Sequence, residues 1–406
     1  MKWIADYYRA HGCEVSGSDL ALGGHCAANV DGADMVIYTS AVAADNPELA
    51  AARELEIPVY TRAEALGRIA GEFEYVTAVS GTHGKSTVTG MLASVLANFS
   101  PAVHVGGTMG GKRGGVDGEM LIAEACEYQR NFLTLSPDLA VVLNIELDHT
   151  DCYKTFSSLI STFARFAAQS RAVVIPDTFE AFLKPRPGGK QILVGPRGQY
   201  ALIDCRLDKG GSKFSVKTPE GIFDARLNVI GKHNAVNAVF AVAAARFCGA
   251  EYDEIREGLA AFGGIDRRLQ RVGACCGLPV FSDYAHHPTE IGAGIAALKS
   301  SGYTRPLVAF QPHTYERLST LLTPFACSLL AADSVIMPVF NARGGVRLAT
   351  AYDLADKIRA LGGKSTAAAS FEESALLVRH AVRGHDAVIV MGAGDNEKIL
   401  PLILEK

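Results

Sequence analysis

The segment TAVSGTHGKSTVTGML, residues 77–92, nearly spells a phosphate-binding loop. The common form, G-x-x-x-x-G-K-[ST], needs its first glycine where this chain has Val79. The flanks place the Gly-Lys-Ser triplet, residues 84–86, between a β-branched run at 75–79 and apolar residues at helical spacing over 85–98. Such a turn presents backbone N–H groups and a helix N-terminus to phosphates. The segment therefore predicts a nucleotide site, and an ordinary glycine-rich strand-to-helix turn is the alternative.

Length and composition limit the class of protein. A chain of 406 residues is long enough for about two to four domains. Its net charge of −4, without a basic stripe, argues against a nucleic-acid partner, and no apolar run of about 18 residues predicts a membrane span. The nine cysteines include no C-x-x-C pair and the N-terminal residues show no signal-peptide pattern, so we expect a cytoplasmic protein with reduced thiols.

Strand-like and helix-like segments alternate along the whole chain, which predicts an α/β fold of parallel sheets covered by helices. The first region includes a predicted strand at residues 13–19. The second carries the phosphate loop and a β-rich insert at 191–230, and the third includes a predicted helix over 315–330. The region boundaries fall near residues 73 and 268.

Polar side chains follow two predicted strands of the second region. Glu124 ends one strand and Glu127 lies just beyond it, while the next strand is followed by Asn144, Glu146, Asp148, His149 and Asp151. Carboxylates beside a phosphate loop suit Mg²⁺, a hard cation that bridges nucleotide phosphates. Any one of these residues could instead cap a loop, but their combination with Lys85 and Ser86 favours a metal site.

Four further polar clusters stand at element ends. They are His233, Asn234 and Asn237; Arg267, Arg268 and Arg271; Asp283, His286, His287 and Glu290; and His313, Tyr315 and Arg317. Asn234 alone is most simply a helix N-cap, and the arginines alone would be a solvated charge run. The histidines lack the close Cys/His pairs of structural zinc, so we do not expect zinc.

Seven motifs in order carry a resemblance to a known family. SGTHGKST, EACEY, NIELDHTD, GKHNAVNA, DRRLQRVG, DYAHHPTEI and FQPHTYERL resemble those of the Mur ligases. The resemblance runs from about residue 4 to near the C-terminus. It implies three domains: a Rossmann-like UDP-sugar domain over 1–73, a central P-loop ATPase-type parallel sheet with a β-rich insert over 74–268, and a Rossmann-like domain for amino acid and ATP over 269–406.

The resemblance also implies an activity. Such a ligase uses ATP and Mg²⁺ to join the lactyl carboxylate of UDP-N-acetylmuramate to L-alanine through an acyl phosphate, in peptidoglycan precursor synthesis. Two alternatives stay open: a related ligase that recycles a murein tripeptide onto the same nucleotide sugar, and a non-catalytic nucleotide-binding relative. The resemblance sets no oligomeric state.

The family motifs imply a role for each matching residue. The phosphate loop would comprise Gly81, Thr82, His83, Gly84, Lys85, Ser86 and Thr87, with Lys85 on the outer phosphates and Ser86 on one Mg²⁺. Glu124 and His149 would hold a second Mg²⁺. The remaining ATP contacts would come from His233, Asn234 and Asn237 at adenine, Arg268 at the phosphates and Asp283 at the ribose. The amino-acid substrate would meet His286, His287, His313 and Arg317. Lys85, His149 and Arg268 would be the catalytic groups.

The start of the sequence departs from the family pattern. A strand and a glycine-rich turn that hold the UDP diphosphate are expected before the first helix, whereas this sequence opens on that helix, residues 2–11. We therefore expect a truncated first domain, an internal start at Met1 and weak binding of UDP-N-acetylmuramate.

Overall fold

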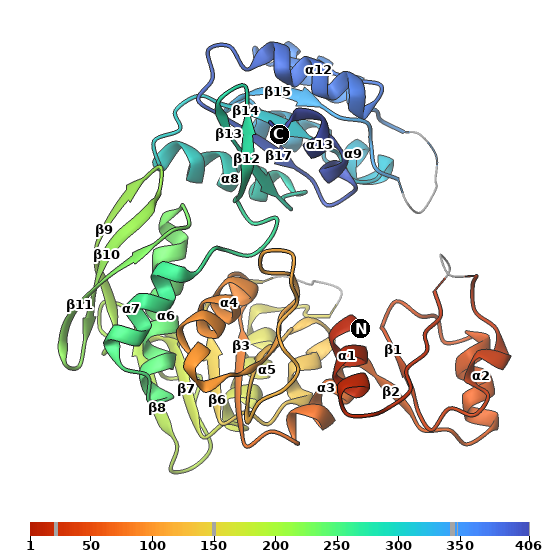
Figure 1. The fold of residues 1–406 in the computed structure, drawn as a ribbon, viewed down its shortest axis with the longest axis vertical. Coiled ribbons are helices and arrows are strands. Elements are labelled where there is room, and N and C mark those ends of the chain that lie inside the picture. Colours follow the sequence, from red (N-terminus) through yellow and green to blue (C-terminus); the bar gives the residue numbers. More distant parts are fainter. Residues whose placement is uncertain (20–22, 148–151, 342–345, 347, 406) are drawn as a thin grey trace. The chain divides into compact units, whose positions relative to one another are not determined.

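A computed structural model describes residues 1–19, 23–147, 152–341, 346 and 348–405. The chain divides into two compact units, each an α/β assembly (Figure 1). The N-terminal unit comprises Met1–Ile203, Ser215–Asp224 and Val236–Ala261, and the C-terminal unit comprises Asp204–Phe214, Ala225–Ala235 and Phe262–Lys406. The expected α/β fold is confirmed, and the domain boundaries near 73 and 268 stay predictions.

The first region forms a small parallel pair of strands. Val36 pairs with Val59 in a two-stranded sheet of β1 and β2. The elements are α1 (Lys2–Ala10), the 3-10 helix η2 (Ala27–Val30), β1 (Val36–Tyr38), α2 (Pro47–Glu54), β2 (Val59–Thr61) and α3 (Arg62–Ala70). The pair is short because each strand has only three residues.

The strand predicted at residues 13–19 is wrong. These residues form no strand, because no described segment lies alongside to accept and donate their backbone hydrogen bonds. Side-chain hydrogen bonds hold the segment instead. The Ser18 hydroxyl donates to the Glu48 carboxylate at 2.7 Å, and the Arg9 guanidinium donates to the carbonyl of Val15 at 3.1 Å. Its apolar and polar alternation therefore indicated a strand that lacks a partner.

Helix α1 packs onto the core of the N-terminal unit. Trp3, Ile4 and Tyr7 are buried in a cluster that also contains residues of α3 and of the large sheet. The Trp3 indole N–H donates to the carbonyl of Gly115 at 3.1 Å. The apolar face of α1 is thus covered, as an amphipathic helix requires.

The large sheet of the N-terminal unit has six parallel strands in the order β4-β5-β3-β6-β7-β8. Their bounds are β3 (Tyr75–Ser80), β4 (Ala102–His104), β5 (Met120–Glu124), β6 (Leu139–Val142), β7 (Ala172–Pro176) and β8 (Lys190–Val194). The helices are α4 (Lys85–Val95), α5 (Phe156–Ala168), α6 (Lys232–Phe247) and α7 (Tyr252–Ala261), with 3-10 turns η3 (Ala97–Phe99), η4 (Tyr128–Thr134) and η5 (Asp177–Phe179). The strands read as apolar runs because helices cover both faces.

Strand order places a ligand site at the middle of this sheet. The crossover after β3 runs toward β4 and the crossover after β6 runs toward β7, in opposite directions from two neighbouring strands. Open α/β sheets bind ligands at the carboxyl ends of such strands. The phosphate-loop segment follows β3 at this position.

The predicted β-rich insert is also present. Strands β9 (Ala201–Asp208), β10 (Gly211–Thr218) and β11 (Gly221–Leu227) form a sheet in the order β11-β10-β9. Alternate residues of β11 are buried, as expected for strands with one covered face.

The C-terminal unit holds a second six-stranded sheet, in the order β12-β13-β17-β14-β15-β16. Only the edge strand β12 runs antiparallel to its neighbour. The strands are β12 (Gln270–Cys275), β13 (Leu278–Asp283), β14 (Pro306–Phe310), β15 (Asp333–Ile336), β16 (Ser365–Ala367) and β17 (Ala387–Met391). The helices are α8 (Pro288–Ser300), α9 (Tyr315–Thr320), α10 (Leu322–Leu329), α11 (Ala351–Ala360), α12 (Phe371–Ala381), the 3-10 turn η6 (Asn396–Ile399) and α13 (Leu400–Ile403).

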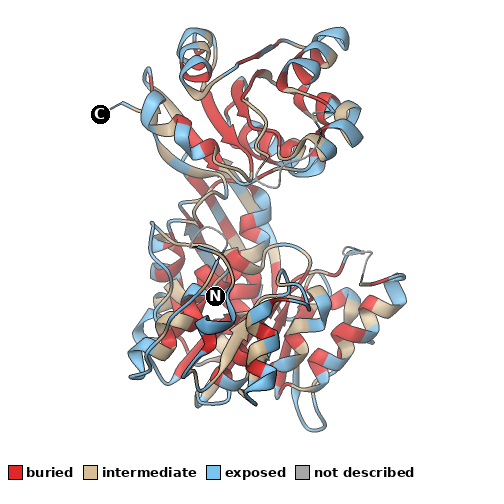
Figure 2. Ribbon diagram, turned by 90° about the vertical axis from the view of Figure 1, so that its right-hand side faces the viewer, coloured by how far each residue is buried: buried red, intermediate tan, exposed pale blue. Residues whose placement is uncertain are grey.

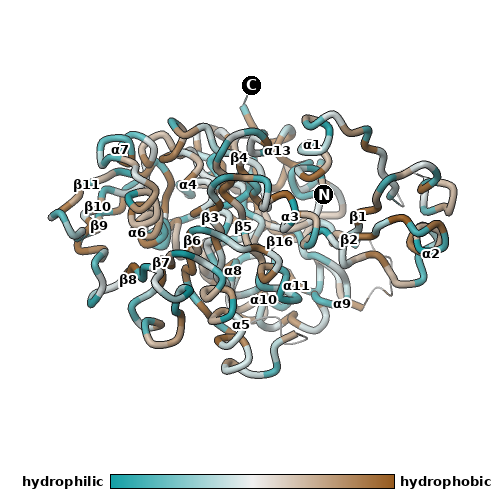
Figure 3. Tube along the Cα trace, turned by 90° about the horizontal axis from the view of Figure 1, so that it is seen from below, coloured by the Kyte–Doolittle hydropathy of each residue, from teal (hydrophilic) through white to brown (hydrophobic). Residues whose placement is uncertain are grey.

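Burial follows the layers of each unit. Buried residues concentrate on the strands and on the inner faces of the helices (Figure 2). The helices alternate between hydrophilic and hydrophobic residues along the chain (Figure 3), and α11 buries Ala351, Leu354, Ala355 and Ile358 at helical spacing. Among the described residues, no helix combines the length and apolar character needed to cross a membrane.

The helix predicted over 315–330 is two helices. The break lies at Leu321, whose backbone angles are φ −110° and ψ 21°. Pro324 explains it, since a proline has no N–H to donate and its ring clashes with the carbonyl four residues earlier, here that of Thr320. Apolar residues continue at helical spacing on both sides of Pro324, and this pattern predicted one helix where the structure has two.

An aromatic cluster should dominate the stability of the N-terminal unit. Phe163 is fully buried, and its ring centroid lies 5.0 Å from that of Phe132. We expect Phe163→Ala to lower the free energy of unfolding by about 3–5 kcal/mol, because it leaves a cavity in a packed core. Phe182→Ala is the control, since Phe182 is 56% exposed. Urea unfolding followed by circular dichroism measures both, and equal losses would contradict the assignment of Phe163 to the core.

Candidate active site

The phosphate loop has the backbone geometry that an anion site needs. Gly81 and Gly84 have φ angles of 136° and 86°, and Gly84 is the N-cap of α4. A Cβ on Gly84 would lie 2.8 Å from the Asn237 side-chain oxygen, so a larger residue is excluded both by conformation and by space. The missing glycine at position 79 therefore does not prevent the loop from forming.

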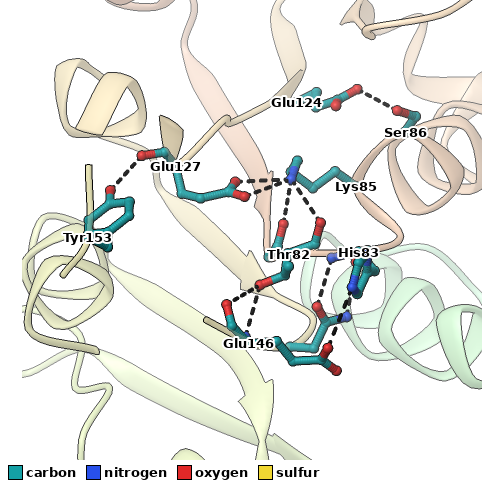
Figure 4. Close-up of polar contacts among 10 residues, drawn as sticks. Thr82, His83, Lys85, Ser86, Glu124, Glu127, Glu146 and Tyr153 are labelled. Carbon is teal, nitrogen blue, oxygen red and sulfur yellow. Dashed lines mark hydrogen bonds and ion pairs between the residues drawn. The ribbon is translucent and has the colours of Figure 1, made fainter. Parts of the chain in front are cut away.

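Lys85 is held inside the loop by its own backbone and by a carboxylate. Its ammonium donates to the carbonyls of Gly81 at 2.6 Å and Thr82 at 3.3 Å, and lies 3.0 Å from Glu127 (Figure 4). The side chains of Lys85 and Glu127 are only 13% and 3% exposed. A lysine so placed offers a positive charge to any anion that can replace Glu127.

Glu127 is itself fixed by a buried tyrosine. The Tyr153 hydroxyl donates to the backbone carbonyl of Glu127 at 2.5 Å. Two and three residues beyond it, Gln129 and Arg130 have positive φ angles of 52° and 60°, which are uncommon for residues other than glycine. The segment after β5 thus adopts a specific, costly backbone path that presents the Glu127 carboxylate to Lys85.

Glu124 connects the loop to the neighbouring strand. One carboxylate oxygen accepts from the Ser86 hydroxyl at 2.8 Å and from the backbone N–H of Gly106 at 2.8 Å. A hydroxyl and a carboxylate are the oxygen ligands that Mg²⁺ accepts in nucleotide sites, where it keeps several waters. The described residues contain no cluster of three or more His, Cys, Asp or Glu side chains that could hold a metal by themselves.

The predicted metal partner of Glu124 cannot be placed. His149 lies outside the described residues, as do Asp148 and Asp151. The roles of His149 as a metal ligand and as a catalytic group stay predictions.

The segment after β6 fastens the loop from its other side. Asn144 accepts from the His83 backbone N–H at 2.8 Å and donates to the His83 carbonyl at 3.0 Å. The Thr82 hydroxyl bonds both backbone groups of Glu146, at 2.9 and 3.2 Å. The His83–Glu146 ion pair at 3.5 Å is exposed and contributes little. Asn144 and Glu146 therefore act by shaping the loop.

The three residues expected at adenine lie at the start of α6 but contact different neighbours. Asn234 is 7% exposed and donates to the Ile230 carbonyl at 2.8 Å, so one of its amide N–H groups is already used. The His233 ring lies against Gly231, and Asn237 lies against Gly84 of the loop. Of these three residues, Asn237 is the one that these contacts place beside the phosphate loop. That His233, Asn234 and Asn237 contact adenine stays a prediction.

In the C-terminal unit, Asp283 ends β13 in a partly desolvated position. It accepts from the backbone N–H groups of Leu269 at 2.9 Å and Ala285 at 2.7 Å. Burial raises the pKa of Asp283 to about 6, although these two hydrogen bonds and the nearby Arg268 cation oppose the shift. A carboxylate held ready at a strand end suits a ligand that donates hydrogen bonds.

Arg267 and Arg268 differ in their surroundings. Arg267 has φ 60° and donates to the carbonyl of Gly392 and to the side chain of Asn396, both at 2.6 Å. Its guanidinium also lies 4.8 Å from the Tyr284 ring centroid. Arg267 is therefore structural, whereas Arg268 is exposed and stays the predicted phosphate contact.

The residues expected around the amino acid follow β13 and β14, two strands that β17 separates in the sheet. The ring centroids of His286 and His313 are 6.2 Å apart. His287 caps α8, and its ring accepts from the Thr289 N–H at 3.4 Å. The guanidinium of Arg317, in α9, is half-buried without a hydrogen-bond or ion-pair partner among the described residues. Substrate contacts of these four residues stay predictions.

The sequence missed the ion pair of Glu127, which it grouped with the candidate metal carboxylates, and gave His104 no role. Glu127 follows Glu124 by three residues, but nothing in the pattern showed that it faces Lys85. His104 lies in a three-residue strand that the sequence did not indicate, and its side chain is 8% exposed. No sequence signal would have separated it from an ordinary core residue.

Three models of known protein domains match successive parts of the chain. Residues 1–74 match the Mur ligase family catalytic domain, residues 79–245 the Mur ligase middle domain, and residues 267–394 the Mur ligase glutamate ligase domain. The chain belongs to the Mur ligase family. Its match to UDP-N-acetylmuramate–L-alanine ligase of Caldicellulosiruptor bescii is 37% identical and covers 94% of this chain and 88% of the relative.

Other relatives extend the similarity over the whole chain. The corresponding ligase of Agathobacter rectalis is 34% identical and covers 100% of this chain and 95% of the relative. The crystal structure of UDP-N-acetylmuramate–alanine ligase from Thermotoga maritima has a TM-score of 0.79 at 26% identity and covers 98% of this chain and 90% of that one. A murein peptide ligase from Psychrobacter arcticus, with a TM-score of 0.66 at 21% identity, shares the fold.

The Lys85–Glu127 pair predicts a stability that depends on nucleotide. Glu127→Gln should destabilise the nucleotide-free protein by roughly 3 kcal/mol, because it leaves the largely buried Lys85 charge without its counter-ion. ATP should restore most of the loss, since its phosphates replace the carboxylate. Thermal unfolding with and without ATP measures this. The control is Glu146→Gln, whose carboxylate is 68% exposed, and an equal loss of Glu127→Gln stability in both conditions would contradict the exchange.

Proposed function

We propose that this chain ligates L-alanine to the lactyl carboxylate of UDP-N-acetylmuramate, with conversion of ATP to ADP and phosphate. The similarity to curated ligases of that name over 94–100% of the chain carries the proposal. The phosphate loop supports it: Lys85 bonds a loop carbonyl and Ser86 bonds Glu124, and a cation, a hydroxyl and a carboxylate are the groups that a phosphoryl transfer from ATP needs.

The reaction proceeds in two balanced steps. A lactyl carboxylate oxygen bonds to the γ-phosphorus of ATP, and the bond between that phosphorus and the β–γ bridging oxygen breaks to release ADP. The amine nitrogen of L-alanine then bonds to the acyl carbon, loses a proton, and the acyl carbon–oxygen bond to phosphate breaks. The protein contributes positions and charges rather than covalent chemistry.

The residues of the loop perform the first step. Lys85 leaves Glu127 and neutralises the outer phosphates, while the backbone N–H groups at the start of α4 bind the remaining charge. Ser86 would hold one Mg²⁺, and Glu124 and His149 would hold a second. When bound, Mg²⁺ supplies positive charge that makes the γ-phosphorus more electrophilic.

Residues of the C-terminal unit serve ATP and the amine. Asp283, ionised above its raised pKa, accepts hydrogen bonds from the ribose hydroxyls, and Arg268 binds the phosphates. Arg317 binds the alanine carboxylate, because its guanidinium has no partner within the described residues. His286, His287 and His313 line the remainder of the amino-acid site. His233 and Asn234 bind adenine together with Asn237, which belongs to the N-terminal unit.

Lys85 should be indispensable for turnover but not for folding. We expect Lys85→Ala to reduce ATP-dependent ligation by at least about a thousandfold, since it removes the charge aimed at the transferred phosphate. Lys213→Ala, an exposed lysine of β10, is the matched control. Release of phosphate from ATP with UDP-N-acetylmuramate and L-alanine measures both, and wild-type turnover in Lys85→Ala would sink the assignment.

The same phosphate-release assay separates the substrate alternatives. Wild-type turnover with L-alanine and not with the murein tripeptide supports the proposal. Turnover with the tripeptide alone would assign the recycling reaction instead. Absence of turnover with either amine, in protein that binds ATP, would favour a non-catalytic relative.

Glu124 should set the metal requirement. Glu124→Gln keeps an oxygen that can accept from Ser86 and Gly106 but loses the charge, so we expect it to raise the Mg²⁺ concentration for half-maximal activity about tenfold to a hundredfold. Glu119→Gln, exposed before the other end of β5, is the control. Magnesium titration of ligation measures the shift, and unchanged curves would remove Glu124 from the metal site.

A further inference from the structure

Thr314 has a backbone conformation that is unusual for its residue type. Its angles are φ 62° and ψ 142°, and it lies in the loop between β14 and α9. Among the eight described non-glycine residues with positive φ, Thr314 is the one with a β-branched side chain. Glycine enters this region of φ and ψ readily, whereas a β-branched residue there is a strained outlier. Such strain persists where the surrounding contacts enforce it, and it is concentrated in functional segments.

Hydrogen bonds on both sides of Thr314 enforce this conformation. Its N–H donates to the carbonyl of Phe340 at 2.7 Å, and the Phe340 N–H donates to the carbonyl of Pro312 at 2.9 Å. The loop is therefore paired, around His313, with the segment that follows β15. On its other side Thr314 is the N-cap of α9, and its hydroxyl accepts from the Arg317 N–H at 3.3 Å. Because φ sets the angle between the chain before and after a residue, a relaxed, negative φ would break one of these two sets of contacts.

The segment that holds Thr314 is itself tightly packed. A Cβ on Gly394 would lie 2.5 Å from Cγ of Phe340 and 2.6 Å from the Gln311 side-chain oxygen. Gln311 is 1% exposed, and its amide donates to Asp395 at 2.8 Å. The segments after β14, β15 and β17 thus meet without room for a methyl group at Gly394. This packing resists the shift that would let Thr314 relax.

Two side chains predicted to meet the amino-acid substrate flank the strained residue. His313 precedes it, and its ring centroid lies 5.5 Å from that of Phe340, on which it stacks, and 6.2 Å from that of His286. Arg317 follows in the first turn of α9, with a half-buried side chain. The bend at Thr314 sets the direction in which α9 leaves the loop. It therefore sets where Arg317 lies relative to His313.

We propose that Thr314 is a positioning residue, whose strained backbone holds His313 and Arg317 in place for the amino-acid substrate before that substrate binds. The inference rests on the proposed function and adds how its amine site is organised. A site that is ordered in advance loses less conformational freedom on binding, so it binds its ligand more tightly. L-alanine has few atoms with which to make contacts, so this saving is a large part of its affinity. The same order also places the attacking nitrogen.

Steady-state kinetics of Thr314→Gly test the proposal. Glycine adopts the observed angles without strain but adopts many others as well, and it has no hydroxyl for the Arg317 N–H. We expect KM for L-alanine to rise about tenfold, as the cost of ordering one backbone residue implies, with KM for ATP and for UDP-N-acetylmuramate unchanged within about twofold. Thr314→Ser keeps both the hydroxyl and the restriction on φ, so it should retain the KM values of the wild type.

Thr350 provides a matched control, because it is the N-cap of α11 in the same unit. Its φ is an ordinary −123°, and its hydroxyl accepts from the Asp353 N–H at 3.3 Å. Thr350→Gly should lower the melting temperature by about 2–4 °C, because glycine gains more freedom on unfolding, and should leave KM for L-alanine unchanged. Thr314→Gly should not lower the melting temperature, because the relief of strain offsets the same entropic term.

The outcomes separate a positioning role from a merely structural one. A rise in KM for L-alanine alone, with the melting temperature kept, supports the proposal. An equal fall of the melting temperature in both glycine variants would show that Thr314 is not strained and would overturn it. Unchanged KM for L-alanine in Thr314→Gly, or an equal rise of all three KM values, would overturn it and leave the proposed function intact. A wild-type chain that binds ATP but does not ligate L-alanine would overturn the proposed function, and the role of Thr314 with it.

Discussion

The carboxylate of Glu124 is the contact on which the arrangement of the site depends. Parallel pairing of β3 with β5 sets Val79 opposite Glu124, so the strand end that carries the carboxylate lies beside the strand that leads into the phosphate loop. From there, one oxygen bonds both Ser86 and Gly106, which joins the loop of α4 to the segment after β4. A one-residue slip of register would turn this side chain to the other face of the sheet. The register between the apolar strands β3 and β5 thereby determines that the Glu124 carboxylate meets the phosphate loop.

The loop in its nucleotide-free state satisfies its lysine internally. Lys85 bonds two loop carbonyls and Glu127, so the ammonium is never left buried without partners. In the proposed function, nucleotide phosphates take the place of the Glu127 carboxylate, so the net gain would be smaller than the direct attraction between lysine and phosphate. These contacts hold the loop in its observed conformation without a nucleotide. The positive φ angles of Gln129 and Arg130 indicate that the backbone is strained to place the Glu127 carboxylate there, and such strain is typical of functional segments.

Elements with a clear local pattern of residues could be predicted from the sequence. Elements that depend on residues far away in the chain could not. The phosphate loop, the parallel sheets and the carboxylates beside the loop all followed from strand and helix patterns with polar residues at strand ends. The expected strand at 13–19 failed because pairing is not a local property, and the expected helix over 315–330 failed because apolar spacing outweighed Pro324 in the interpretation. Short strands such as β4 (Ala102–His104) hold too few residues for alternation to be seen. His104 and Glu127 became visible only through what they contact.

Adjacent arginines of the C-terminal unit show why residue type alone does not assign a role. Arg267 and Arg268 share charge, size and location in the sequence, yet the left-handed backbone at Arg267 turns its guanidinium toward Gly392 and Asn396. Those contacts hold the segment after β17 against the turn before β12, in which the Leu269 N–H donates to Asp283. Arg268, by contrast, is exposed. A substitution of Arg267 would therefore act on ligand binding through the position of Asp283, whereas a substitution of Arg268 would act through the loss of a charge.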